Sequence, residues 1–259
     1  MPITMSHHAP IQRHIPMTEA EQAARVQLAA CYHVFAHLGW VESIFNHITL
    51  RVPGPEKIFL INPFGRLYRE VTASNLVAID IDGNPVRETE YPVNRAGFVI
   101  HSAIHANVEQ AHCVMHTHTV SGMAVSCLAE GLMHDSFNGA QLKGRVAYHD
   151  FEGVTVRPEE GERLVKNLGN HTILMLRNHG PVVMDRTIQG MFVKMWALQR
   201  ACEIQVATLG MGDPIMIPQS VVDVHQRDLS VMSGQGGAGL FDFEAWKRRV
   251  DKIDDSWRS

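Results

Sequence analysis

Two histidines one residue apart, His116 and His118, end an apolar stretch that begins at His112. Alternate side chains of a β-strand point to the same face, so a strand here would present both imidazoles on one side. Histidines in an apolar strand are costly unless hydrogen bonds or a metal ion satisfy their nitrogens. The pair alone leaves both interpretations open, and a third ligand is needed to favour the metal.

A third histidine, His179, follows another apolar stretch and lies in the Gly-bearing turn 177–180. A strand that adjoins the first would bring it to the pair. Three imidazoles with positions left open are a ligand set that catalytic zinc uses. The sequence therefore predicts one divalent metal ion, zinc before manganese or iron, on His116, His118 and His179. The alternative is that His179 only caps its turn.

The composition is that of an ordinary globular protein: 259 residues, of which 45% are hydrophobic and 19% charged, with a net charge of −4. This balance gives no indication of a nucleic-acid partner. No signal peptide or membrane-spanning stretch is found, so we expect a cytoplasmic protein without a membrane partner. The cysteines are not spaced as Cys-x-x-Cys and lie in apolar patterns, which predicts buried reduced thiols at Cys31, Cys113, Cys127 and Cys202.

The elements that position the histidines follow from periodicity and turn residues. Residues 1–17 are expected to form a loosely attached arm. Thr18, with Glu21 three residues later, predicts the start of a helix that runs to about Leu38 and ends at Gly39. Further helices are expected over 95–107, 120–129, 158–169 and 187–209, and His101 and His105 share a face of the first of these.

Strands are expected over seven segments: 48–52, 57–61, 76–81, 112–118, 146–148, 173–176 and 181–184. The first two are joined by a short turn and predict a hairpin, so the sheet is at least partly antiparallel. No linker interrupts residues 18–211, which we expect to form one α/β domain. Residues 212–259 are expected to be a C-terminal tail, Gly-rich and mobile by composition at 234–239, with a charged terminal helix over 241–257.

Five motifs occur in order along residues 18–211: Phe45–Arg51, Leu60–Gly65, Ala96–His101, Val114–His118 and Arg177–Gly180. Together they resemble the class II aldolase/adducin family. The resemblance implies a three-layer α/β/α fold with a central, largely antiparallel sheet. It also implies a homotetramer with active sites at subunit interfaces. In the sugar-phosphate aldolases of this family, the histidines that match His116, His118 and His179 hold zinc.

The chain departs from those aldolases at two places. The aldolases carry a Glu on the helix before the His-x-His strand, and Gly97 stands at the matching position. We expect Gly97 to face the metal, with a water or the substrate in the vacated space. The loops that would bind phosphate have no Ser or Thr, and Phe64 would fill the space that a phosphate needs. Asn46 and Gly65 are retained.

These features favour a metal-dependent carbon–carbon lyase that acts on a small, non-phosphorylated oxo- or hydroxy-carboxylate, by aldol cleavage or decarboxylation. In both reactions the metal would stabilise the negative charge left when the bond breaks. Decarboxylation fits somewhat better, because it needs no base to start. Asn46, Gly65 and Arg95 are candidate substrate-binding residues, and Arg95 or Arg51 could pair with a carboxylate. Tyr148 or His101 could supply a proton.

Two other functions use the same sequence features. Iron accepts imidazole readily, so the three histidines could serve a non-haem iron oxygenase. A non-catalytic scaffold, as in the adducin head domain, would share the helix of Ala96–His101. The metal bound after purification and the uptake of oxygen would separate the lyase from the oxygenase, and failure to hold metal would favour the scaffold.

Overall fold

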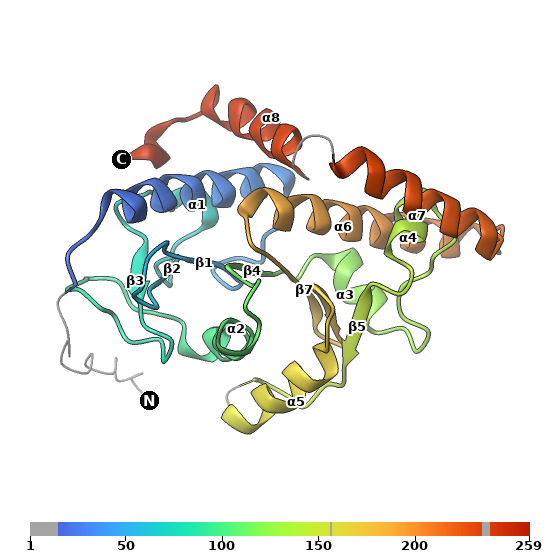
Figure 1. Cartoon of the computed structure of the whole chain (residues 1–259), viewed down its shortest axis with the longest axis horizontal. Coiled ribbons are helices and arrows are strands. Elements are labelled where there is room, and N and C mark those ends of the chain that lie inside the picture. Colours follow the sequence, from blue (N-terminus) through green and yellow to red (C-terminus); the bar gives the residue numbers. More distant parts are fainter. Residues whose placement is uncertain (1–14, 156, 235–238) are drawn as a thin grey trace.

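A single seven-stranded sheet forms the centre of the computed structural model, which describes residues 15–155, 157–234 and 239–259 (Figure 1). Its strand order is β3-β2-β1-β4-β7-β6-β5. Only β5 and β6 pair in parallel, and the other neighbours are antiparallel. The bounds are β1 His47–Arg51, β2 Phe59–Ile61, β3 Val77–Ile79, β4 Cys113–His116, β5 Val146–His149, β6 Ile173–Leu176 and β7 Gly180–Asp185. All seven expected strands and the largely antiparallel sheet are confirmed.

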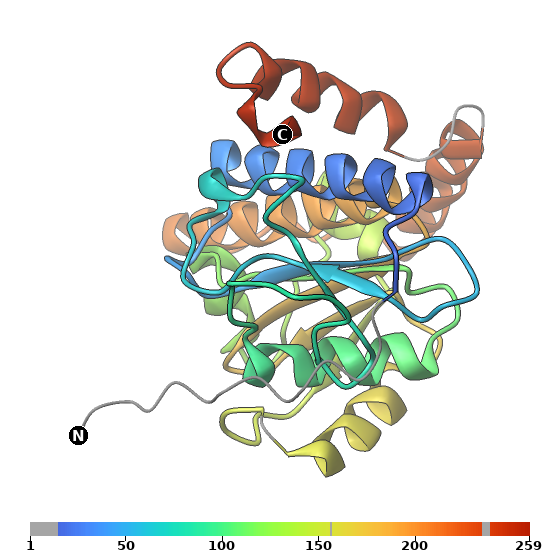
Figure 2. The same cartoon turned by 90° about the vertical axis from the view of Figure 1, so that its left-hand side faces the viewer.

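Helices cover both faces of this sheet, which gives the expected three layers (Figure 2). Helices α1 and α6 lie on one face, with α8 outside them, and α2 and α5 lie on the other. The bounds are α1 Glu19–Leu38, α2 Arg95–Asn107, α3 Val120–Ser126, α4 Phe137–Leu142, α5 Pro158–Leu168, α6 Ile188–Met211, α7 Gln219–Gly234 and α8 Leu240–Asp251, with short 3-10 helices at Tyr68–Glu70 and Ser256–Arg258. None of the helices in the described part of the chain is long and apolar enough to cross a bilayer.

The two central strands divide their side chains between the layers. In β1, Ile48 and Leu50 join the large core under α1 and α6. Thr49, between them, hydrogen-bonds instead to side chains of α2. In the neighbouring strand β4, Met115 belongs to the large core, while Val114 belongs to the core under α2 and α5. The period-two alternation of a strand therefore puts His116 on the α2 side of the sheet.

Local signals fix the ends of most helices. The Thr18 hydroxyl accepts a hydrogen bond from the amide of Glu21, and Gly39 ends α1 in the left-handed conformation. Helix α3 ends at Ser126 and is therefore shorter than the expected helix over 120–129. Cys127 therefore lies at the end of α3 and is exposed, so the expectation that all four cysteines are buried is wrong.

Residues 212–259 pack onto the domain as two helices, α7 and α8, and a final 3-10 turn. Phe243, Val250 and Trp257 are buried in the large core with α1 and α6. The amide of Ala73 also donates to the carbonyl of Trp257 at 2.8 Å, which ties the chain end to the loop before β3. Of the segments expected to be loose, residues 1–14 and 235–238 lie outside the described residues.

Candidate metal centre

The imidazole of His116 is buried at the end of β4, where its Nδ1 lies 3.0 Å from the carbonyl oxygen of Pro181. A carbonyl only accepts hydrogen bonds, so Nδ1 carries the proton and Nε2 keeps its lone pair. Burial lowers the pKa of His116 well below its ordinary value, and His179 and His118 lower it further. His116 is thus a neutral imidazole with its Nε2 free to bind a metal, oriented by a carbonyl behind it.

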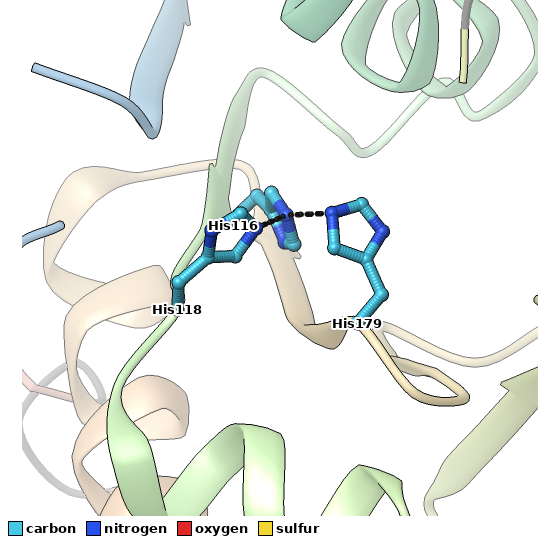
Figure 3. A group of neighbouring side chains, drawn as sticks. All are labelled: His116, His118 and His179. Carbon is cyan, nitrogen blue, oxygen red and sulfur yellow. Dashed lines mark hydrogen bonds between the residues drawn. The ribbon is translucent and has the colours of Figure 1, made fainter. Parts of the chain in front are cut away.

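The Nε2 atoms of His118 and His179 both face this nitrogen, at 2.7 and 3.2 Å (Figure 3). The potential ligand atoms of the three residues all lie within 4.8 Å of one another. A tetrahedral zinc site with Zn–N bonds of about 2.1 Å separates its nitrogens by roughly 3.4 Å. Because one lone pair on His116 faces two imidazole nitrogens, a shared cation satisfies the cluster better than hydrogen bonds do. The three residues therefore fit one divalent ion.

The electrostatics of the cluster also favour a cation. Burial is the largest cause that lowers the pKa of His179, to about 4, and the neighbouring His118 lowers it further. Burial also lowers the pKa of His118. Neutral imidazoles are the form that binds metal, so the site needs no deprotonation near pH 7.

His179 reaches the pair because the turn between β6 and β7 lies directly against the His-x-His segment. Asn178 takes a positive φ of 56°, and Gly180 follows with a φ of +154°. A side chain at Gly180 would place its Cβ 2.5 Å from the carbonyl oxygen of Thr117. Glycine at this position therefore allows the close approach that joins the two parts of the metal centre.

Asn46 supports the centre from the start of β1, with a positive φ of 68°. Its Oδ1 accepts a hydrogen bond from the amide of His118 at 3.2 Å. Its Nδ2 is buried and has no hydrogen-bond partner among the described residues. Asn46 was predicted to bind substrate. In the structure it holds the backbone of a candidate metal ligand, and its binding of substrate stays a prediction.

A second group of imidazoles lies beside the first, between β1 and α2. The hydroxyl of Thr49 lies 2.7 Å from His101 Nδ1 and 2.7 Å from His105 Nε2. The ring of His47 lies against that of His101, with centroids 4.2 Å apart and the ring planes tilted by 39°. We call His47, Thr49, His101 and His105 the buried histidine network.

The protons of this network are fixed by its two ends. His105 Nδ1 lies 2.7 Å from the carbonyl of Ala111 and must donate to it, so His105 Nε2 accepts from the Thr49 hydroxyl. That hydroxyl has one proton, so it accepts in turn from His101 Nδ1–H. His47 Nε2 donates to the carbonyl of Gly97 at 2.7 Å. His101 Nε2 and His47 Nδ1 thus keep their lone pairs, and neither has a partner within the described chain.

The surroundings of Gly97 differ from the expectation that water or substrate fills the place of the missing Glu. A Cβ built on Gly97 would lie 2.2 Å from Cε1 and 2.8 Å from Nδ1 of His47. The imidazole of His47 therefore occupies the space where any side chain at position 97 would begin. The expectation of an open space at Gly97 is wrong, because the side chain of His47, from the facing strand β1, fills that space.

The other predicted site residues are placed differently. His101 is fully buried in the histidine network. The hydroxyl of Tyr148 accepts from the amide of Leu132, and Tyr148 stands on β5, three strand spacings or about 14 Å from β4. Gly65 lies in the exposed loop after β2 with a φ of +92°. The structure therefore does not bring Tyr148 to the metal centre, and the side chain of Arg95 lies outside the described part of the chain.

A cavity of about 510 Å³ opens beside His118. Its walls come from the segment after α1, from the start of α3 and from α6, and include Trp40, Val120, Gln199 and Glu203. Gln199 fixes the polar wall, because it donates to both Ser121 and Glu203 at 2.9 Å. The cavity is large enough for a small carboxylic acid next to the metal centre.

Comparison with known proteins shows the family to which this chain belongs. The Class II Aldolase and Adducin N-terminal domain matches residues 26–206. The chain belongs to the class II aldolase and adducin family. An aldolase II superfamily protein from Pseudomonas syringae has a crystal structure with a TM-score of 0.89 at 38% identity, covering 94% of this chain and 98% of that one.

Other relatives in the class II aldolase and adducin family carry different names. Alpha-adducin of Rattus norvegicus is 39% identical over 253 residues, which cover 92% of this chain and 34% of the adducin. The L-fuculose 1-phosphate aldolase from Glaciozyma antarctica has a TM-score of 0.78 at 25% identity, covering 92% of this chain and 94% of that one. The family and its fold are thereby shown, whereas these relatives point to more than one function.

Sequence reasoning found the three metal-binding candidates but gave no role to His47 and Thr49. The signal was present in the strand pattern, since His47 and Thr49 alternate with the core residues Ile48 and Leu50. Two polar side chains on the inward face of a buried strand indicate a polar network that must be satisfied.

Proposed function

We propose that this protein is a metal-dependent carbon–carbon lyase that acts on a small, non-phosphorylated oxo- or hydroxy-carboxylate. The observation that carries the proposal is the convergence of three imidazole nitrogens, with separations of 2.7 and 3.2 Å at His116 Nε2. A divalent metal bound there would polarise a substrate oxygen and stabilise developing negative charge. Membership of a family that includes aldolases supports the same reaction class.

The chain's own residues would orient the metal centre and its substrate. The Pro181 carbonyl holds the His116 ring, and Asn46 holds the backbone of His118. The cavity beside His118 gives the substrate access to the centre. Asn46 is the candidate that would also bind the substrate, from a position that already contacts the His-x-His segment. Substrate binding by Gly65 and Arg95, and proton transfer by Tyr148 or His101, stay predictions.

The loop that follows β2 supports a substrate without phosphate. The amide of Phe64 donates to the carbonyl of Pro92 at 3.0 Å, and that of Leu67 donates to the carboxylate of Glu70 at 2.7 Å. These amides are therefore engaged and are not free to bind a phosphate. We expect no useful cleavage of fuculose or rhamnulose phosphate, and robust turnover of either would contradict this part of the proposal.

The proposal is tested by measuring bound metal and then turnover. Purified protein should hold one zinc, manganese or iron ion per chain, and His116→Ala should lose it. His37→Ala is the matched control, because His37 is exposed on α1. The loaded protein is then given a panel of oxo and hydroxy acids, with release of aldehyde or carbon dioxide as the readout. Oxygen uptake with bound iron would instead identify an oxygenase.

A non-catalytic scaffold is the second candidate, and the similarity to alpha-adducin favours it. Wild-type protein that holds no metal at micromolar zinc would overturn the lyase and support the scaffold.

We also propose that the chain forms a homotetramer with the metal centre near a subunit interface. Apolar side chains are exposed around the cavity beside His118, including Val120 at 82% and Val206 at 45%. Exposed apolar groups of this kind are typical of protein interfaces. Light scattering at micromolar concentration should give four times the chain mass, and a monomer mass would contradict the proposal.

A further inference from the structure

A second cavity, of about 640 Å³, opens between the first half of α1, the end of β1 and the start of α6. We call it the sheet-end cavity. It includes His112, the residue before β4, whereas the metal candidate His116 ends that strand. These two positions are roughly 13 Å apart along an extended chain. None of the three candidate metal ligands lines the sheet-end cavity, so it is separate from the metal centre.

The walls of the sheet-end cavity are mostly apolar. Ala23 and Ala24 contribute from α1, Leu50 and Val52 from the end of β1, and Ile188 from the start of α6. All of these side chains except that of Ala23 are buried. A cavity of this size with apolar walls is suited to take the hydrocarbon part of a small organic molecule out of water.

Two arginines bring positive charge to this cavity. Arg51 ends β1 and Arg186 follows β7, and both line the cavity together with His112. The amide of Arg51 donates to the carbonyl of His112 at 2.7 Å. On the other side, Cys113 pairs with Asp185 across β4 and β7, so Arg186 follows beside His112. Burial is the largest cause that lowers the pKa of His112, and the charges of Arg51 and Arg186 lower it further. Both charges therefore act at the same end of the sheet.

The described part of the chain does not neutralise these two charges. Within it, the side chains of Arg51 and Arg186 form no ion pair and no hydrogen bond. Asp185, the acid next to Arg186, is engaged with Lys194 at 2.6 Å. The charge of Glu109 raises the pKa of the nearby His112 by less than the charge of either arginine lowers it. The cavity is therefore lined by two guanidinium groups that are available to an acid.

The start of α6 adds to the same field. Thr187 caps this helix by accepting from the amide of Gly190. The amides of Ile188 and Gln189, which also line the cavity, have no hydrogen-bond partner in the described chain. Free amides at the start of a long helix favour an anion. They support the two arginines and do not define the site by themselves.

We propose that the sheet-end cavity binds an organic anion with an apolar body, whose acid group pairs with Arg51 and Arg186. The hydrocarbon part would lie against α1 and the end of β1. The planar fork of arginine fits a carboxylate and a phosphate alike, so the shared chemistry is an acid group on an apolar chain. This inference does not depend on the proposed function. It gives Arg51 an anionic partner other than the substrate of the metal centre.

Octanoate is the test ligand, because it joins a carboxylate to an apolar chain. It is titrated calorimetrically into the full chain loaded with zinc, beside 1-octanol, acetate and octyl phosphate. We expect octanoate to bind at least about tenfold more tightly than octanol, which lacks the charge, and than acetate, which lacks the chain. The tighter of octanoate and octyl phosphate identifies the preferred acid group.

Three substitutions locate the bound octanoate. Arg51→Gln and Arg186→Gln should each weaken its binding about tenfold, because each removes a charged hydrogen-bond donor. Ala23→Phe fills the cavity from the exposed surface of α1 without changing the charge, and should weaken binding at least about fivefold. Arg227→Gln is the matched control, since it makes the same change of charge on the exposed surface of α7. It should leave the affinity unaltered, and urea unfolding checks that every variant folds.

Removal of zinc separates this site from the metal centre. A chelator should leave the octanoate affinity within about twofold, because the cavity and the metal centre lie at opposite ends of β4. Loss of octanoate binding together with zinc would place the carboxylate at the metal and overturn the proposal. Absence of binding to the wild type at millimolar octanoate, equal affinity for octanol, or unaltered affinity in both arginine variants would overturn it as well. None of these results bears on the proposed function, which is tested by metal content and turnover.

Discussion

The two groups of imidazoles in this protein are neighbours and yet have opposite hydrogen-bonding characters. In the metal centre, three Nε2 atoms converge at 2.7 and 3.2 Å with no hydroxyl or carbonyl between them. In the buried histidine network, the Thr49 hydroxyl separates two rings and the Ala111 carbonyl ends the chain of hydrogen bonds. The first group has the geometry of a site for one cation, whereas protein groups satisfy most of the hydrogen bonds of the second. The partners of each nitrogen, and not the number of histidines, therefore distinguish a metal site from a structural network.

The largest expected effect is on metal affinity. It tests whether the metal centre and the buried histidine network are separate groups. His116→Ala removes the nitrogen that both other ligands face, so zinc affinity should fall at least about a hundredfold. Thr49→Val changes the neighbouring network and should leave zinc affinity within about threefold. Competition titration with a chelating dye measures both. Equal losses in the two variants would mean that the groups act as one site.

The next effect tests the close packing of His47 on Gly97. Gly97→Ala places a Cβ against the His47 ring and should lower the free energy of unfolding by about 2 kcal/mol, as overpacking does. Adding His47→Ala should recover part of this loss. Gly210→Ala is the matched control, because nothing lies within 4 Å of a Cβ there, and alanine should stabilise α6 slightly. Urea unfolding of the wild type, of Gly97→Ala and His47→Ala alone, and of the double variant gives the coupling, and additive effects would contradict the contact.

A smaller effect is expected from the hydroxyl that joins His101 to His105. Thr49→Val keeps the shape of the side chain but leaves two buried imidazole nitrogens without a partner. The free energy of unfolding should fall by about 2 kcal/mol or somewhat less. Thr49→Ser keeps the hydroxyl and should lose only the methyl contribution of about 1 kcal/mol. If serine is as destabilising as valine, the hydroxyl does not organise the network.

The last effect, comparable with that of Thr49→Val, is a dependence of stability on pH in the metal-free protein. The pKa of His47 is lowered to about 4 in the folded state by burial, so the unfolded state binds a proton first as the pH falls. Its stabilising contribution is complete above pH 6.5 and is lost as the pH falls toward 4. Within this window, each such histidine should lower the free energy of unfolding by about 1.4 kcal/mol for each unit by which the pH falls. Urea midpoints between pH 7.5 and 5 should fall less in His47→Leu than in the wild type.

Much of the candidate site could be predicted before the fold was known. The His-x-His spacing places two imidazoles on one face of a strand, and the turn at His179 supplies a third after another apolar segment. The structure brings the three together as expected. The role of Tyr148 could not be judged in this way, because Tyr148 packs against the large core, whereas His116 lies on the α2 side of the sheet. The face of the sheet on which a residue lies is a long-range property that local spacing does not contain.

The C-terminal segment shows the same limit for the fold. Residues 241–257 carry a helix pattern, and α8 and the final 3-10 turn lie there. Helix α7 was not expected, because its apolar residues form no clear stripe along one face. In agreement with this, several of them, such as Val221 and Val231, are exposed in the structure. The burial of Trp257 against the main core depends on α1 and on the loop before β3, which are distant in sequence.

By itself the sequence determined most of the elements, the family motifs and the three metal-binding candidates, because hydrophobic periodicity, capping residues and ligand spacing act over short distances. Helices α4 and α7 were not among them. Only the tertiary structure decided what surrounds Gly97. The sequence shows a missing side chain on α2, and the fold fills that space with His47 from β1. It also decided which imidazole nitrogens carry protons, since carbonyls of Gly97, Ala111 and Pro181 act on rings from other elements. Hydrogen-bond partners across a sheet depend on register and packing, which no single segment specifies.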